Sequence, residues 1–293
     1  MSRYSRRDFL KASAAAGAVA AISNVPLPAE TAKATDWVAL GKSDVKVTRL
    51  AFGTGSFNGS VQRDLGQESF NRLVRHAYDS GIRFFETSDS YAGMHTMLGI
   101  ALKGLPRESY ALMTKVTTYD GTDPHQRIDE LRSQIRSDYF DVMLLHWQRG
   151  TQWPHETTGW QEAIEKAQQR GAVRIRGASV HGLPALAQVP TFNWLQVAMI
   201  RCNHKGTRMD TPVADSDETG NVPEVVQRIH QARAAGMGVI SMKLVGEGVF
   251  KREDRQKAMR FAFRDAKVDA VTVGYKNNAE IDEAIENINM AFA

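Results

Sequence analysis

The chain has 293 residues, of which 42% are hydrophobic and 24% are charged, and this composition excludes a disordered or fibrous protein. Its formal net charge of +4 is unevenly spread, because five Lys or Arg residues and two acidic residues fall within positions 1–34, which leaves about +1 for the remainder. That remainder contains no basic run, so nucleic-acid binding is not expected. The single cysteine, Cys202, excludes an intramolecular disulfide, and we assign it no role.

The N-terminus has the pattern of an export signal. Arg6 and Arg7 precede Phe-Leu-Lys and then an Ala- and Gly-rich stretch, residues 12–22, that is too short and too weakly apolar for a stable membrane span. The segment is similar to a twin-arginine (Tat) signal, whose export machinery would be a partner of the chain. This pathway exports folded proteins, so a cofactor can be bound before export.

A processing site is predicted next to this signal. Ala32 and Ala34 put small residues at the two positions that a signal peptidase reads, which predicts cleavage after Ala34. Residues 1–34 would then be the signal peptide, and residues 35–293 a periplasmic or secreted domain. The alternative is a basic amphipathic helix that stays on the protein.

From Val45 onward, short β-branched or aromatic runs alternate with longer stretches of apolar period near 3.6. Eight such units predict an α/β protein with a closed (β/α)₈ barrel, the TIM barrel, because an open doubly wound sheet usually has about six strands. The predicted strands span residues 48–52, 83–87, 110–115, 141–146, 173–179, 194–199, 238–243 and 270–274. Helices are predicted to begin near Glu68, Met94, Pro124, Gly159, Leu183, Pro223, Asp254 and Ala279. The polar gap at 205–221 is predicted to be a loop on the active-site face.

Polar side chains stand at the ends of three neighbouring strands. Glu86 ends the second strand with Tyr91 just beyond it, Lys115 ends the third, and His146 ends the fourth. Functional groups of barrel enzymes lie just after the carboxyl ends of the strands, so these four should converge on one rim. An ammonium that ends an apolar strand needs a paired carboxylate. It also favours the phenolate of a nearby tyrosine, which would lower a pKa that is otherwise near 10.

These segments resemble the signatures of the aldo/keto reductase family, in family order and from about Leu40 to the C-terminus. The likeness is carried by Phe-Phe-Glu-Thr-Ser-Asp-Ser-Tyr at 84–91, Leu-Gly-Ile-Ala-Leu at 98–102, Thr-Lys at 114–115 and Ser-Asp-Tyr-Phe-Asp-Val-Met-Leu-Leu-His-Trp at 137–147. The resemblance implies an NAD(P)-dependent oxidoreductase that interconverts a carbonyl and an alcohol by hydride transfer.

The resemblance also implies a role for each residue at the rim. Tyr91 would be the proton donor, and Lys115 would lower its pKa. His146 would orient or polarise the substrate carbonyl. Glu86 would pair with Lys115, although the family expects Asp at this position, and Asp89 is the alternative partner.

Cofactor contacts follow from the same resemblance. Ser179 and Gln196 match residues that hold the nicotinamide carboxamide, whereas Val180 replaces an expected Asn. Met199 stands where many relatives place a Tyr that stacks on the nicotinamide. The residues expected around the pyrophosphate and adenosine are Leu244, Gly246, Gly248, Lys276, Asn277 and Glu280. Glu280 stands where NADP-preferring relatives carry Arg or Gln and so opposes NADP, whereas Lys276 could meet its 2′-phosphate. On the habit of the family we expect NADP(H), with NAD(H) as a close alternative.

The substrate pocket is expected to be apolar and partly aromatic, which suits many small carbonyl compounds, and the chain is expected to be a monomer. The residues assigned to this pocket are Trp147, Phe57, Met94 and Trp153. Two other functions stay open. His146, His181 and His204 could bind the cation of a metal-dependent hydrolase. A reductase-like barrel could instead bind cofactor or a partner without turnover, given Glu86, Val180 and Met199.

Overall fold

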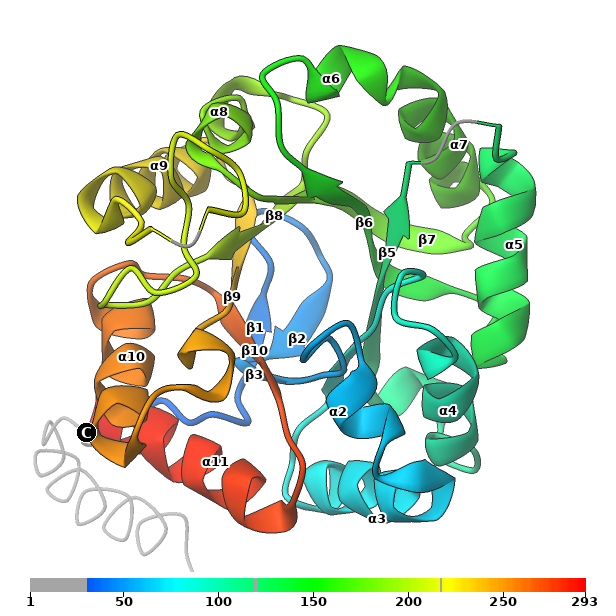
Figure 1. The fold of residues 1–293 in the computed structure, drawn as a ribbon. Helices are drawn as coiled ribbons and strands as arrows, with labels where there is room; N and C mark the ends of the chain where they lie inside the picture. Colours follow the sequence, from blue (N-terminus) through cyan, green and yellow to red (C-terminus); the bar gives the residue numbers. More distant parts are fainter. Residues whose placement is uncertain (1–30, 119–120, 217) are drawn as a thin grey trace, which may run out of the picture. The chain divides into compact units, whose positions relative to one another are not determined.

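In the computed structural model, which describes residues 31–118, 121–216 and 218–293, eight parallel strands close into a barrel with helices around it (Figure 1). The predicted (β/α)₈ fold is therefore confirmed, while the Arg6-Arg7 segment lies outside the described residues. The strand order around the barrel is β10-β3-β4-β5-β6-β7-β8-β9. The strands are β3 (Leu50–Gly53), β4 (Phe84–Glu86), β5 (Ala111–Thr117), β6 (Phe140–Gln148), β7 (Val173–Val180), β8 (Val197–Arg201), β9 (Gly238–Met242) and β10 (Ala270–Gly274).

All eight predicted helices are present in the described part of the chain, although the one after β7 has only four residues. These helices are α3 (Gly66–Asp79), α4 (Met94–Ala101), α5 (Pro124–Ile135), α7 (Thr158–Gln169), α8 (Leu183–Leu186), α9 (Val222–Ala234), α10 (Arg252–Arg264) and α11 (Asn278–Phe292). The sequence did not predict α2 (Ser60–Arg63), α6 (Trp153–Glu156) or three 3-10 turns, Arg107–Ser109, Val189–Thr191 and Gly246–Gly248. No helix among the described residues is both long and apolar enough to cross a membrane.

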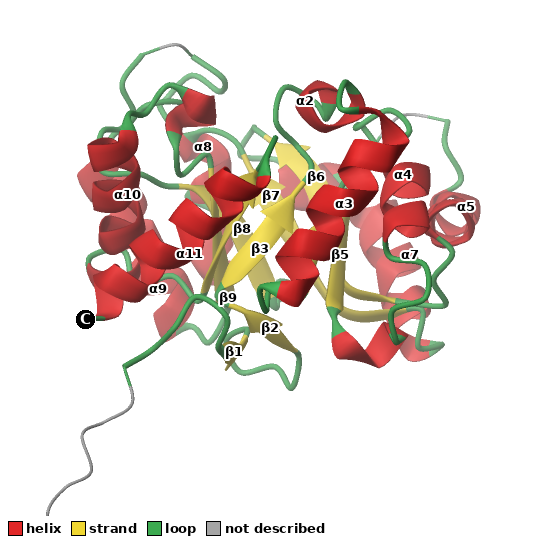
Figure 2. Cartoon of the chain, turned by 90° about the horizontal axis from the view of Figure 1, so that it is seen from below, coloured by secondary structure: helices red, strands yellow, loops and turns green. Residues whose placement is uncertain are grey.

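A short hairpin closes the amino end of the barrel. Its strands, β1 (Trp37–Ala39) and β2 (Lys46–Thr48), pair antiparallel and were not predicted. Leu40, Val45 and Val47 of this hairpin are buried in the same apolar cluster that fills the barrel interior. Figure 2 shows the hairpin at one end of the barrel and α2 at the other. The carboxyl ends of the strands therefore form the open rim.

The segment expected to hold the processing site is packed into this domain. Ala34 is fully buried, its backbone N–H donates to Oδ1 of Asn289 at 2.8 Å, and its carbonyl accepts from the backbone N–H of Leu50 at 3.0 Å. Cleavage after Ala34 would remove both hydrogen bonds and a buried methyl group. The observed packing thus favours a mature chain that keeps Ala34.

Chains that begin at Ala32 and at Thr35 should therefore differ in thermal stability. The lost hydrogen bonds and methyl group are worth about 2 kcal/mol together, which lowers the Tm of the shorter chain by about 4–8 °C. Differential scanning calorimetry of both chains measures this, and the longer chain with Ala34→Gly, which loses only the methyl group, should fall between them. Equal Tm values for the two chains would show that Ala34 contributes nothing to the fold.

Candidate active site

A buried ion pair joins two neighbouring strands at the open rim. Nζ of Lys115, on β5, donates to Oε1 of Glu86, at the end of β4, and to the carbonyl of Thr87 at 3.0 Å. The exposed fractions of the Lys115 and Glu86 side chains are 1% and 3%. Thr272, on β10, donates its hydroxyl to the other Glu86 oxygen at 3.2 Å. Both charged groups are thus matched by partners, which a buried ion pair requires.

Asp89, the alternative partner of Lys115, has different contacts. Its carboxylate accepts from the backbone N–H of Thr117 at 3.0 Å and from the Thr117 hydroxyl at 2.7 Å. Nε of Arg127 lies 3.7 Å from the same carboxylate. Asp89 therefore links the loop after β4 to the end of β5, and the longer Glu86 side chain reaches Lys115.

Tyr91 lies against this ion pair. Nζ of Lys115 is 4.9 Å from the centre of the Tyr91 ring. A Cβ atom added at Gly55 would come within 2.6 Å of the Tyr91 hydroxyl, so only glycine leaves space beside that oxygen. Burial raises the pKa of Tyr91 well above its usual 10, and the charges of Glu86, Asp89 and Glu247 raise it further. Burial thus dominates the pKa of Tyr91 in this structure, and its lowering by Lys115 stays a prediction.

His146 stands next to Tyr91 with its ring perpendicular to the phenol, at 5.8 Å between ring centres. Its Nδ1 is 2.8 Å from the hydroxyl oxygen of Ser88 and 3.2 Å from that of Ser90. Burial lowers the pKa of His146 well below 6.5, and the positive charge of Lys115 contributes. A neutral imidazole that accepts a serine hydroxyl at Nδ1 carries its proton on Nε2. Ser88 and Ser90 were missed as site residues, although both lie in the segment that carries the family resemblance.

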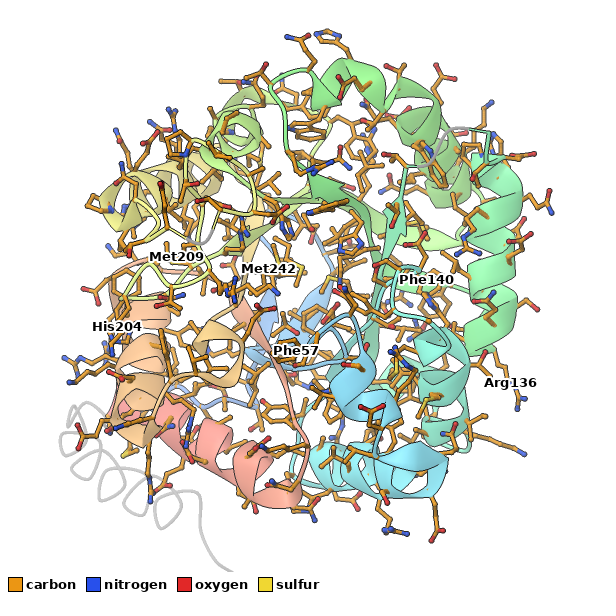
Figure 3. All side chains as sticks on the ribbon, in the orientation of Figure 1. Phe57, Arg136, Phe140, His204, Met209 and Met242 are labelled. Atoms are coloured by element: carbon orange, nitrogen blue, oxygen red, sulfur yellow. The ribbon has the colours of Figure 1, made fainter. Side chains whose placement is uncertain are left out.

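A cavity of about 540 Å³ opens above these side chains, and it is more polar than predicted. Trp147 lines it, as expected. Met94 is fully buried, and Trp153 packs against Phe192 with its indole N–H on the carbonyl of Ala185, so neither belongs to the pocket. Phe57, labelled near the barrel mouth in Figure 3, lines a neighbouring cavity instead. Large apolar residues near strand ends are thus found in the core as well as in the site, and their position in the sequence does not distinguish the two.

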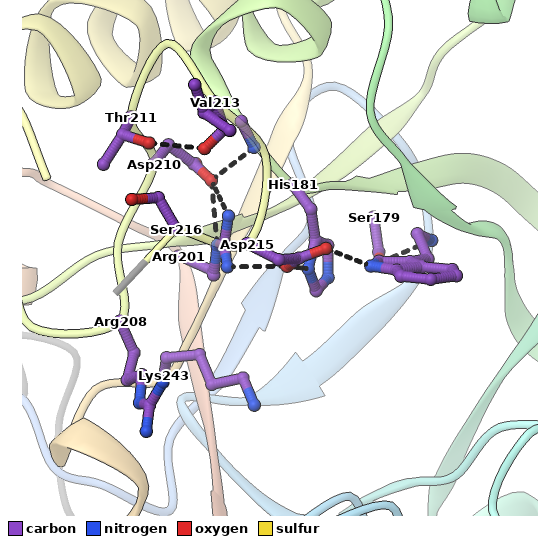
Figure 4. Close-up of polar contacts among 12 residues, drawn as sticks. Ser179, His181, Arg201, Arg208, Asp210, Thr211, Val213, Asp215, Ser216 and Lys243 are labelled. Carbon is purple, nitrogen blue, oxygen red and sulfur yellow. Dashed lines mark hydrogen bonds and ion pairs between the residues drawn. The ribbon is translucent and has the colours of Figure 1, made fainter. Parts of the chain in front are cut away.

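The segment between β8 and α9 reaches over the cavity, as a loop on the active-site face should. Asp215 of this segment accepts from Nε1 of Trp147 at 2.7 Å and from Nη1 of Arg201 at 3.1 Å (Figure 4). Its Oδ1 is also 3.0 Å from Nδ1 of His181. Arg201, at the end of β8, also donates from Nε to Oδ1 of Asp210 at 2.8 Å. Arg201 and Asp215 line the cavity and were not predicted.

Comparison with known proteins identifies this arrangement. A model of the aldo/keto reductase family matches residues 49–291. The chain belongs to this family. A model of the twin-arginine translocation signal matches residues 3–23.

Individual aldo/keto reductases are similar over parts of the chain. L-galactose dehydrogenase of Arabidopsis thaliana is 33% identical over 156 residues, which cover 50% of this chain and 48% of that protein. A methylglyoxal reductase of Yersinia pestis is 23% identical over 198 residues, which cover 61% and 68% of the two chains. The match to the plant enzyme thus spans about half the length of each protein.

Solved structures share the fold. The holo form of an aldo-keto reductase of Bacillus halodurans superimposes with a TM-score of 0.67 at 19% identity, covering 86% of this chain and 90% of that one. A Pseudomonas aeruginosa chain assigned to the aldo-keto reductases gives a TM-score of 0.72 at 18% identity, covering 90% and 99%.

A groove suited to an extended ligand runs along the rim of this aldo/keto reductase. A second cavity of about 370 Å³ lies between α11 and the loop after β9, and a small one of about 80 Å³ lies between it and Tyr91. Glu247 lines all three cavities, and Gly55 and Tyr91 line both the small cavity and the one above His146. The space beside the Tyr91 hydroxyl, which a Cβ at Gly55 would fill, therefore continues toward α11. An elongated dinucleotide fits this path.

The predicted cofactor residues divide between this groove and other places. Gly248, Lys276 and Glu280 line the 370 Å³ cavity, whereas Leu244 is buried in the apolar core. Asn277 caps α11 by accepting from the backbone N–H of Glu280 at 3.0 Å. Gly246 stands in the 3-10 turn after β9 and is not among the residues that line the cavity.

Two charged residues of the same cavity were missed. Arg255, on α10, lines the cavity together with Glu283, on α11. The guanidinium donates to both carboxylate oxygens of Glu283, at 2.7 and 2.8 Å. This pairing leaves the cation already matched, so Arg255 adds little net positive charge to the cavity.

The structure does not place the side chain of Gln196 in the groove. Gln196 comes directly before β8, which begins at Val197. Its side-chain oxygen accepts from Nε2 of Gln168 at 3.0 Å and from the backbone N–H of Arg176 at 3.1 Å. Met199 does line the small cavity beside Tyr91. Ser179 is fully buried at the end of β7, and its hydroxyl accepts from the backbone N–H of Trp147 at 3.4 Å.

The histidines considered for a metal site have other partners. His204 packs against Phe250 with 5.5 Å between ring centres. His146 faces Tyr91, and His181 contacts Asp215. The described part of the chain contains no group of three or more His, Cys, Asp or Glu side chains placed to hold a metal ion.

Backbone strain is concentrated along the groove. Nine described residues other than glycine have positive φ, a conformation that costs of order 1 kcal/mol for such residues. Seven of the nine line the three cavities: Phe57, Asn58, Trp147, Arg208, Asp215, Lys243 and Glu247. Strain of this kind collects at functional sites, so its location independently marks the rim as the working face.

Proposed function

We propose that this aldo/keto reductase reduces an aldehyde or ketone to an alcohol, or catalyses the reverse reaction, by hydride transfer with a nicotinamide cofactor and with Tyr91 as proton donor. The observation that carries the proposal is the contact of Tyr91 with the buried Lys115–Glu86 pair on one side and His146 on the other, at the floor of a cavity. A metal-dependent reaction has no comparable support among the described residues.

The raised pKa of Tyr91 suits proton donation. A phenol that stays protonated at neutral pH can give its proton to the carbonyl oxygen as that oxygen gains negative charge. The phenolate left behind lies beside the Lys115 ammonium, which stabilises it. Glu86 supplies the counter-charge that the buried ammonium requires. The proton returns to Tyr91 from solvent.

His146 is suited to hold the same carbonyl oxygen. Its lowered pKa keeps the imidazole neutral, and we assign the Ser88 hydroxyl as the donor to Nδ1, so that the ring proton is on Nε2. This N–H can donate to the oxygen before and during the reaction, and a fixed donor of this kind stabilises developing negative charge. Ser88 and Ser90 would therefore position His146 without touching the substrate.

The cofactor would occupy the groove between α11 and Tyr91. When bound, a reduced nicotinamide supplies the hydride that adds to the carbonyl carbon. Gly248, Lys276 and Glu280 line the far end of the groove and would contact the adenosine half, while Met199 lines the small cavity beside Tyr91. NADP(H) and NAD(H) should bind with similar affinity, because Lys276 and Glu280 oppose each other in charge, with Nζ 3.7 Å from Oε1.

Export is part of the proposal. The match to a twin-arginine signal at residues 3–23 supports delivery of the folded domain to the periplasm or medium by the Tat machinery. The packing of Ala34 supports processing at a position before Ala34 rather than after it. The relatives named as an L-galactose dehydrogenase and a methylglyoxal reductase support a small carbonyl or alcohol as the substrate.

Tyr91→Phe should lower turnover by about 10² to 10⁴, the usual contribution of general acid catalysis, and leave cofactor affinity nearly unchanged. Loss of reduced-cofactor absorbance against a panel of aldehydes and ketones measures turnover, and tryptophan fluorescence measures cofactor binding. Tyr78→Phe is the matched control, because the Tyr78 hydroxyl bonds Ser109 away from the groove. If Tyr91→Phe turns over as fast as the unchanged protein, Tyr91 is not the proton donor. If the unchanged protein binds cofactor but reduces no carbonyl of the panel, the chain is a cofactor-binding protein and not a reductase.

Glu280→Arg should shift the ratio of NADP to NAD affinity by about one to two powers of ten toward NADP. The substitution replaces repulsion of the 2′-phosphate by a guanidinium that can grip it. Fluorescence titration of both cofactors against wild type and variant measures the ratio. Glu286→Arg, on the same helix but outside the cavity lining, is the control for added charge. An unchanged ratio in Glu280→Arg would mean that the adenosine ribose lies elsewhere.

A further inference from the structure

His181 is a buried polar side chain of the catalytic cavity that the proposed reaction does not use. It follows β7 directly and is 9% exposed. It lines the same cavity as Tyr91 and His146. Its Nε2 atom is buried and has no hydrogen-bond partner among the described residues. A buried polar atom without a partner costs about 1–3 kcal/mol, so an unpaired nitrogen in a ligand cavity points to a partner on the ligand.

Asp215 determines which hydrogen-bonding role that nitrogen has. Its Oδ1 is 3.0 Å from Nδ1 of His181, and an ionised carboxylate can only accept. The Asp215 carboxylate also accepts from Trp147 and Arg201. The hydrogen bond with His181, followed by these two contacts, holds the pKa of Asp215 far below the usual value. Burial lowers the pKa of His181 as well, so the ring is neutral at pH 7. The single ring proton is therefore on Nδ1, and Nε2 presents a lone pair.

The cavity consequently offers two histidines with opposite hydrogen-bonding roles. His146 presents an N–H at Nε2, which suits a carbonyl oxygen, and His181 presents an acceptor, which suits an O–H. A carboxylate on the substrate has no proton for Nε2. A substrate ammonium would face Arg201, Arg208 and Lys243, which outnumber the two carboxylates of the same cavity, Asp215 and Glu247. The neutral hydroxyl is thus the donor that matches both the nitrogen and the charges around it.

We propose that Nε2 of His181 accepts a hydrogen bond from a hydroxyl group of the substrate, so that the enzyme selects hydroxylated carbonyl compounds over their deoxy analogues. The inference rests on the proposed carbonyl reduction and adds the class of substrate. Asp215 is a positioning residue in this arrangement, because it acts through the tautomer of His181. A site that pairs with a substrate hydroxyl disfavours the analogue that lacks it by about 10² to 10⁴ in kcat/KM.

The test compares glyceraldehyde with propanal, which has the same carbon chain without hydroxyl groups. Wild type should prefer glyceraldehyde by about 10² or more in kcat/KM. His181→Met, which keeps the volume and loses the acceptor, should bring this ratio to within about threefold of unity, and His181→Gln, which keeps an acceptor, should restore part of it. Asp215→Asn should lower the ratio by about tenfold, because the ring can then turn its proton to Nε2. His204→Met, on the same rim but packed against Phe250, is the matched control and should keep the wild-type ratio.

The outcomes separate this inference from the proposed reaction. If His181→Met keeps the wild-type ratio of kcat/KM for glyceraldehyde over propanal, the inference is wrong. If that variant keeps the ratio but binds cofactor more weakly, Nε2 of His181 contacts the cofactor instead. Binding of glycerol and 1-propanol, measured by NMR chemical-shift titration, gives the same comparison without turnover. If wild type and His181→Met bind glycerol equally, the acceptor role is wrong even where carbonyls are reduced. If wild type binds glycerol and His181→Met does not, the role of His181 as acceptor holds even where no carbonyl is reduced.

Discussion

The catalytic rim depends on one interaction, the buried ion pair between Lys115 and Glu86. Neither charge could stay ionised there alone, because desolvation of a single ion costs several kcal/mol. The pair fixes the end of β5 to the end of β4 and to Thr272 of β10, and Tyr91 rests on it. Burial, with the charges of Glu86 and Asp89, keeps the pKa of Tyr91 high, so the phenol is protonated at neutral pH.

The rest of the rim places groups around Tyr91. Closure of the amino end by the β1–β2 hairpin leaves the carboxyl rim as the open face, and the long segment after β8 brings Asp215 across it. Seven residues in strained backbone conformations line the resulting groove. The packed barrel beneath the groove stabilises the fold and offsets this strain. Ser88 and Ser90 orient His146, and Asp215 orients His181. Side chains that do not touch the substrate thus determine which hydrogen-bonding groups the cavity presents.

Periodicity and the strand-end rule predicted the barrel, its eight strands and the meeting of Tyr91, Lys115 and His146, because each depends on local pattern and topology. Gln196 was predicted inside the sixth strand, but the apolar run that begins at Trp194 starts before that strand does, with Trp194 stacked on Phe192 outside the ladder. Phe57, Met94 and Trp153 were misassigned because aromatic and apolar residues fill cores and pockets alike. The contacts of Asp215 join residues far apart in the chain through an irregular loop, and no periodic pattern reports such contacts.

The central claim is that the Lys115–Glu86 pair exists for the chemistry of Tyr91 and not for stability. Its direct test measures urea unfolding and carbonyl turnover on the same samples of Glu86→Gln, Lys115→Met and the double variant. Each single variant should lose about 3–5 kcal/mol in the free energy of unfolding, because it leaves an unpaired buried group, and the double variant should regain most of that loss. The stable double variant should nevertheless turn over no faster than Tyr91→Phe. Turnover close to that of wild type in the double variant would contradict the account.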